Sequence, residues 1–244
     1  MATTARARLS AERRFYSWMA AMMIVVVLIG FGPSFYLRGV VPSYPRPNPS
    51  LSPMVLLHGL AFTLWLLVFW AQTALLAADR RDLHMRLGLF GMALAVLLIP
   101  IMYLVAVWQV ARANQPPFTT ALAWTAVPLA AIPSYALLIW LGWSRRRQAQ
   151  VHKRLMLGAA LILVGGPAIG RFPIAPPTMA GHIVQQTIGC LLFLPLLWWD
   201  RKTLGRFHWA SVLGFALAVA SAAVPDVLMV MPGWETVAAR LPGV

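Results

Sequence analysis

The sequence predicts an all-α membrane protein, a bundle of seven transmembrane helices, and three observations lead to this fold class. Of the 244 residues, 60% are hydrophobic and only 11% are charged, whereas a soluble domain is about 25% charged. The hydrophobic residues gather into seven long runs, and a helix needs about 20 such residues to cross a bilayer. Short basic blocks separate the runs. These features exclude a water-soluble globular protein and a disordered chain.

Each hydrophobic run is expected to form one membrane-spanning helix of a single transmembrane domain over residues 1–244. Continuous runs are typical of helices and exclude a transmembrane β-barrel, whose strands alternate polar and apolar residues. The first run is too long for the hydrophobic part of a signal peptide and has no cleavage site after it, so we expect it to be retained. The seven runs are Trp18–Leu37, Pro53–Ala78, Leu87–Val110, Phe118–Trp143, Leu155–Gly170, Ile183–Trp199 and Phe207–Met231.

The distribution of basic residues predicts that the N-terminus is inside and the C-terminus outside. With this topology the outer segments contain five of the 20 Lys and Arg residues, and the inner segments contain the other 15. An excess of Lys and Arg in inner loops is the rule for membrane proteins. We therefore expect a basic cytoplasmic tail at 1–14 and a short outer tail at 232–244. The five outer residues are Arg38, Arg46, Arg112, Arg171 and Arg240.

The net charge of +14 would indicate nucleic-acid binding in a soluble protein. Here the basic residues lie between membrane spans, so we predict no nucleic-acid partner. The expected partners are the lipid bilayer and, at the cytoplasmic face, anionic lipid.

Three inner loops share a layout that predicts three similar helical hairpins, with the first helix as an added element. In each loop a tryptophan is followed by a basic block and then by a histidine, namely His84, His152 and His208. Each histidine thus lies near a helix N-terminus, where the helix dipole disfavours protonation. Neutral imidazoles suit a metal ion, so these three histidines with Asp200 form one candidate metal site. The alternative is that they are ordinary interfacial histidines of basic loops.

Two more histidines, His58 and His182, lie toward the outer face. Together with His84 and His152 they predict two tiers of imidazoles, one near each face of the membrane. Stacked histidine pairs are how b-type membrane cytochromes hold haem across a bilayer. We therefore consider haem b, bound by these four histidines, as the first cofactor hypothesis and a divalent metal as the second. Either cofactor predicts a redox role.

Polar residues within the hydrophobic runs predict a cavity between the helices. His58, Trp65 and Gln72 are spaced by seven, so they share one helix face that should avoid lipid. The segment 165–181 is rich in Gly and Pro, which is typical of irregular backbone beside a cavity, although a plain connection is the alternative. A cavity without a cofactor would indicate a small-solute or lipid transporter, or a membrane assembly factor. The expected cavity-lining residues are Trp65, Gln72, Gln185, Gln186, Asp226 and Arg171.

The sequence leaves open whether the protein is an enzyme, and the one catalytic alternative is metal-assisted hydrolysis at the three-histidine site with Asp200. The sequence has no Ser-x-x-Lys, Gly-x-Ser-x-Gly, His-Glu-x-x-His or Walker motif. Three short stretches resemble a family of bacterial seven-helix inner-membrane proteins without an assigned activity. This resemblance implies a multi-pass protein of the bacterial inner membrane and supplies no catalytic residue. The stretches are Leu57-His58-Gly59, Leu83-His84-Met85-Arg86-Leu87-Gly88 and His152-Lys153-Arg154-Leu155-Met156.

Overall fold

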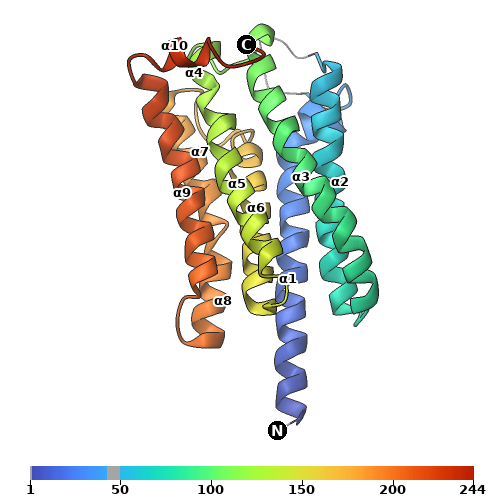
Figure 1. The fold of residues 1–244 in the computed structure, drawn as a ribbon. Helices are drawn as coiled ribbons and strands as arrows, with labels where there is room; N and C mark the ends of the chain where they lie inside the picture. Colours follow the sequence, from blue (N-terminus) through green and yellow to red (C-terminus); the bar gives the residue numbers. More distant parts are fainter. Residues whose placement is uncertain (1, 43–49) are drawn as a thin grey trace.

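The computed structural model is a bundle of long helices that run side by side (Figure 1). It describes residues 2–42 and 50–244, with side chains from residue 9 onward. The short α4 and α10 lie across one end, and the N-terminal end of α1 projects from the other. The helices are α1 (Ala2–Phe31), η1 (Gly32–Tyr36), α2 (Pro53–Ala77), α3 (Arg81–Arg112), α4 (Ala121–Trp124), α5 (Ala126–Ser144), α6 (Ala149–Ile169), α7 (Met179–Leu191), α8 (Leu194–Leu204), α9 (Trp209–Val230) and α10 (Trp234–Ala238).

Six helical segments are long and apolar enough to cross a membrane. This result confirms an all-helical multi-pass membrane protein. The fifth expected span, Leu155–Gly170, corresponds to α6, which is not among these six segments and carries charged residues in its first two turns. The six segments are Leu9–Tyr36, Pro53–Ala77, Arg81–Arg112, Ala121–Ser144, Met179–Leu204 and Trp209–Val230.

The central helix of the bundle is α6. It contacts α1, α5, α7 and α9, and 14 of its 21 residues are buried. Small residues allow this close packing, because a Cβ atom added to Gly165 would lie 2.8 Å from the carbonyl oxygen of Gly189 in α7. Most contacts of α6 are therefore with protein rather than with lipid.

Two expected helices are divided. The run from Phe118 begins as α4, which Thr120 caps by accepting a hydrogen bond from the Ala123 amide, and continues as α5. The run from Ile183 is divided between α7 and α8. A proline follows the second division at the start of α8, a position where its missing N–H is tolerated.

The segment 165–181 is less irregular than its composition predicts. Helix α6 continues through Gly165, Gly166 and Pro167 and ends at Ile169, so only residues 170–178 lack a helix. Pro167 lies in the last turn of α6, where its missing N–H removes one backbone hydrogen bond. The two glycines face α7 instead of an irregular turn, because a Cβ on Gly166 would clash with the side-chain oxygen of Gln186.

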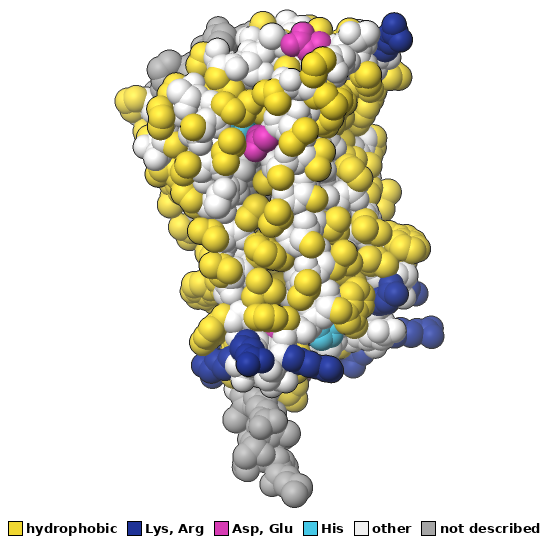
Figure 2. Space-filling view, turned by 90° about the vertical axis from the view of Figure 1, so that its left-hand side faces the viewer, with side chains coloured by type: hydrophobic (Ala, Val, Ile, Leu, Met, Phe, Trp, Pro, Cys, Tyr) yellow, Lys and Arg dark blue, Asp and Glu magenta, His cyan; other side chains and the backbone are white. Residues whose placement is uncertain are grey.

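The surface separates hydrophobic and basic side chains along the bundle axis. Figure 2 shows hydrophobic side chains over the middle of the molecule and most of the visible Lys and Arg at the end where the N-terminal helix projects. We call this the basic end. Consecutive helices pack as neighbours, α2 with α3, α5 with α6, and both α7 and α8 with α9. The orientation across a membrane and the likeness of the three hairpins remain predictions.

Candidate functional site

A buried ion pair joins α6 to α8 at the basic end. The side chains of Arg154 and Asp200 are 1% and 0% exposed. Arg154 donates from Nε and Nη2 to Asp200 Oδ1, at 2.8 and 2.6 Å. Its Nη1 donates to the backbone and side-chain oxygens of Gln150, at 2.8 and 2.7 Å. All three guanidinium nitrogens of Arg154 therefore have hydrogen-bond partners.

The second oxygen of Asp200 extends this network to α9. Asp200 Oδ2 accepts a hydrogen bond from the His208 backbone amide at 3.0 Å. The ring of His208 caps α9, because its Nδ1 accepts from the Ala210 amide at 3.2 Å. Burial lowers the pKa of His208, and the nearby Arg154 charge lowers it further. The neutral imidazole that results is the form able to accept at Nδ1.

At the basic end, side chains of α1 also contact α6 and α8. Glu12 forms an ion pair with Lys153 of α6, and the Lys153 Nζ lies 5.2 Å from the centroid of the Tyr16 ring. Phe15 stacks on Trp199 of α8 with ring centroids 4.5 Å apart. The role of Arg154 was not predicted, because the expected helix begins at Leu155. The structure starts α6 at Ala149, so Arg154 is a charged residue within a helix. A charge at such a position could have indicated a buried partner.

The predicted metal site of His84, His152, His208 and Asp200 is not formed. Among the side chains of residues 9–42 and 50–244, no group of three or more His, Cys, Asp or Glu could hold a metal ion. Asp200 is instead used by Arg154 and by the His208 amide. A carboxylate committed in this way is a poor ligand, since metal binding would leave the buried guanidinium unpaired.

Two of the inner histidines interact electrostatically. They are His84, in the first turn of α3, and His152, in the first turn of α6. His152 Nδ1 is 2.8 Å from the carbonyl oxygen of Gly142, and the His84 ring interacts with the backbone carbonyl of Gln72 in α2. His84 Nδ1 and both amide atoms of Gln72 are buried without a hydrogen-bond partner. We call His84, His152 and Gln72 the inner histidine site.

The two outer histidines have different surroundings. His58 of α2 lies against Phe62, with ring centroids 4.4 Å apart, and interacts electrostatically with Arg171. Its Nδ1 is buried without a partner. The ring of His182 lies against Phe118 and Trp124 at centroid distances of 5.8 and 5.3 Å. The described contacts therefore place the predicted outer tier in two separate environments.

His182 has an acidic neighbour that sequence spacing does not indicate. Its Nε2 lies 3.3 Å from Asp226 Oδ1, which joins α7 to α9. The two atoms are within ion-pair distance, yet both are buried without an aligned hydrogen bond. We call His182 and Asp226 the outer pair. Ionisable side chains at such positions mark pathways or binding sites in membrane proteins.

The other predicted cavity residues each contact a different part of the bundle. Trp65 is part of the hydrophobic core and packs edge-on against Tyr135. Gln185 Nε2 donates to the Phe172 carbonyl at 2.9 Å, and the Arg171 guanidinium lies 4.0 Å from the centroid of the Phe31 ring. Gln186 packs against Gly166. A cavity lined by these residues remains a prediction, and the outer pair and Gln72 are the members with unpaired buried atoms.

Comparison with known proteins adds no family to this description. No family model, no curated protein and no solved structure matches the chain. The case for a function therefore rests on two groups of buried ionisable side chains with unpaired atoms, the inner histidine site and the outer pair.

Proposed function

We propose that this protein lies in the bacterial inner membrane with its basic end inside, and that His84 and His152 bind haem b for electron transfer. With α6 added to the six apolar segments, the chain crosses the membrane seven times. The 21 residues of α6 extend about 30 Å, which is the thickness of the hydrocarbon core. The basic end faces the cytoplasm by the positive-inside rule.

The inner histidine site is the single observation that supports haem. Two imidazoles from different helices lie near each other, and one has a buried nitrogen without a partner. Haem iron takes four ligands from its porphyrin and needs only axial ligands from the protein. A structural zinc ion needs four protein ligands and a catalytic one about three. Because the described residues contain no such group, haem fits better than a divalent metal.

Each residue of the site has a role that its contacts support. The Gly142 carbonyl holds the Nδ1–H of His152 and so orients the ring with Nε2 as the ligand, the usual arrangement of ligating histidines. The unpaired amide of Gln72 offers a donor and an acceptor to the edge of a bound group. Arg81 interacts electrostatically with His84 and supplies positive charge for the haem carboxylates. Bound haem would supply reversible one-electron chemistry.

Visible absorption spectroscopy of the purified protein tests this proposal. We expect a Soret band and about one haem per chain by pyridine haemochrome assay, and we expect His84→Ala and His152→Ala each to lose it. His208→Ala is the matched control, because it removes an imidazole at the same end that caps α9 instead. A wild-type protein without a Soret band, or a band that survives in both variants, would refute haem binding.

The outer pair favours a second function, the transport of a small polar solute without a cofactor. His182 and Asp226 bring ionisable atoms together in the helical bundle and leave them without aligned hydrogen bonds. We expect Asp226→Asn and His182→Gln to change solute flux into proteoliposomes and to leave any haem spectrum unchanged. Glu235→Gln is the matched control, because this exposed acid at the same end accepts a hydrogen bond from Thr120. Wild-type flux in Asp226→Asn and His182→Gln, as in the control, would rule out this function.

A further inference from the structure

A groove between α1 and α8 lies at the basic end of the bundle. Its volume is about 570 Å³, within the range of about 300–1,000 Å³ that is typical of small-molecule sites. It is independent of both candidate sites, since it shares none of their residues. Its lining residues are Ala11, Arg14, Phe15, Trp18, Pro195, Trp198 and Trp199.

The groove has a rigid base and exposed aromatic sides. Phe15 of α1 and Trp199 of α8 stack nearly parallel, with an interplanar angle of 8°. Trp18 and Trp198 are 55% and 56% exposed. Tryptophan is enriched at membrane–water interfaces, where its ring contacts both acyl chains and polar groups. The groove thus presents apolar surface at the depth where lipid headgroups meet acyl chains.

Positive charge lies beside this apolar surface. Arg14 lines the groove, and Lys202 Nζ lies 4.6 Å from the centroid of the Trp198 ring. The one acid on each helix is held elsewhere, because Glu12 pairs with Lys153 and Asp200 pairs with Arg154. Acids of α1 and α8 therefore do not neutralise these two cations. An anion at the groove would gain from both charges.

We propose that this groove binds one anionic phospholipid from the leaflet at the basic end. The acyl chains contact the exposed indoles of Trp18 and Trp198, and the phosphate interacts with Arg14 and Lys202. Apolar contact and two cations at interfacial depth match a phospholipid better than a soluble anion, which would gain nothing from the aromatic surface. This inference does not depend on haem binding or on solute transport.

Native mass spectrometry of the full chain in detergent tests the proposal. We would titrate phosphatidylglycerol and phosphatidylcholine with the same acyl chains and expect one phosphatidylglycerol to bind at least about tenfold more tightly, since two basic side chains lie beside the groove. The double variant Arg14→Gln/Lys202→Gln should lose most of this preference. Trp18→Ala should weaken the binding of both lipids by a similar factor.

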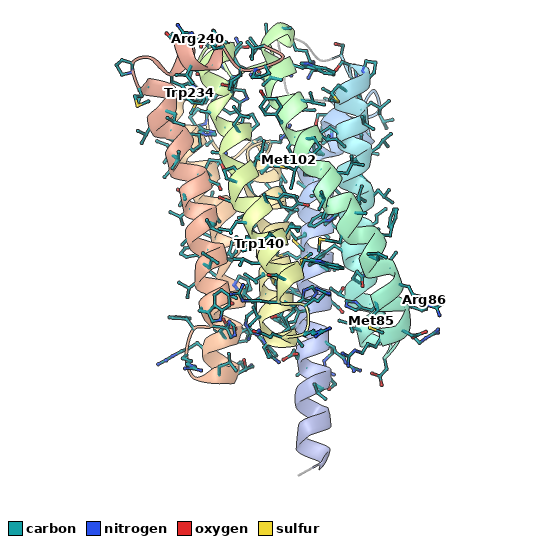
Figure 3. All side chains as sticks on the ribbon, viewed as in Figure 1. Met85, Arg86, Met102, Trp140, Trp234 and Arg240 are labelled. Atoms are coloured by element: carbon teal, nitrogen blue, oxygen red, sulfur yellow. The ribbon has the colours of Figure 1, made fainter. Side chains whose placement is uncertain are left out.

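The matched control removes two charges from the same end but outside the groove. Arg86 and Arg147 are exposed, and Arg86 projects from the base of α3, away from α8 (Figure 3). Arg86→Gln/Arg147→Gln should change the phosphatidylglycerol affinity less than twofold. Equal binding of the two lipids, or an equal loss in the control variant, would overturn the proposal. All exchanged side chains are exposed, so thermal unfolding should be unchanged.

Discussion

Two aspartates at opposite ends of the bundle have very different surroundings. Asp200, at the basic end, is fully buried and accepts hydrogen bonds from two nitrogens of Arg154 and from the His208 amide. Asp226, at the other end, is 18% exposed and has His182 within 3.3 Å without an aligned hydrogen bond. Both acids join helices of the same half of the bundle, yet only Asp200 is fully paired.

The difference separates a structural charge from a candidate functional one. Removing a charge from water is costly, and a buried pair is tolerated only when nearly every polar atom is satisfied. The Asp200 network meets this condition and leaves no atom free for a ligand. The outer pair does not, so its atoms remain available to a proton or a solute. Hydrogen-bond satisfaction therefore distinguishes these two aspartates.

The largest expected effect comes from breaking the Asp200 network. Asp200→Ala leaves the Arg154 guanidinium buried and unpaired, which should destabilise the protein by about 3–5 kcal/mol. Unfolding in detergent, followed by circular dichroism, measures this loss. The double variant Arg154→Met/Asp200→Leu should recover most of it, because no charge is then left buried. If the double variant is as unstable as Asp200→Ala, the loss of stability does not come from an unpaired buried charge.

The next effect concerns the helix contact that supports the outer pair. A Cβ at Gly165 would lie 2.8 Å from the Gly189 carbonyl, so Gly165→Ala must push α7 away from α6. We expect a loss of about 1–3 kcal/mol in the same unfolding assay. Gly158→Ala on the same helix is the control, because its nearest neighbour would be at 3.5 Å, an ordinary contact distance. Equal stability of both variants would contradict this packing.

A smaller effect is expected from the outer pair itself. Asp226→Asn removes a charge without breaking an aligned hydrogen bond, so the free energy of unfolding should change by less than about 1 kcal/mol. The comparison with Asp200→Ala is sharpest when both are measured in the same detergent. A loss as large as that of Asp200→Ala would show that Asp226 is also a structural residue.

The smallest effect is a pH dependence at the basic end. The pKa of His208 is lowered in the folded protein, first by burial and then by Arg154, so the unfolded chain binds the proton more readily. The stability from this residue is therefore present above its unfolded pKa of about 6.5 and is lost as the pH falls below it. His208→Asn keeps a side-chain acceptor for the α9 cap and should flatten the stability profile between pH 7 and pH 5. Identical stability profiles of the wild type and His208→Asn would show that His208 does not cause the pH dependence.

Some predictions from sequence were wrong for identifiable reasons. The interruption at 165–181 is shorter than composition indicated, since Gly165 and Gly166 serve helix packing. The four residues of the predicted metal site are not grouped among the described residues, where Asp200 pairs with Arg154, 46 residues away. Of the two expected histidine tiers, His84 and His152 interact electrostatically, and His58 and His182 have different aromatic neighbours.

The helical membrane class and the basic end can be predicted from local composition, because both follow from long apolar runs and the placement of Lys and Arg. The identity of the central helix and the pairing of the polar atoms cannot be predicted in this way. These properties depend on contacts between residues far apart in the chain, such as Arg154 with Asp200 and His182 with Asp226. Local hydropathy is the same whether a buried charge finds its partner or remains without one.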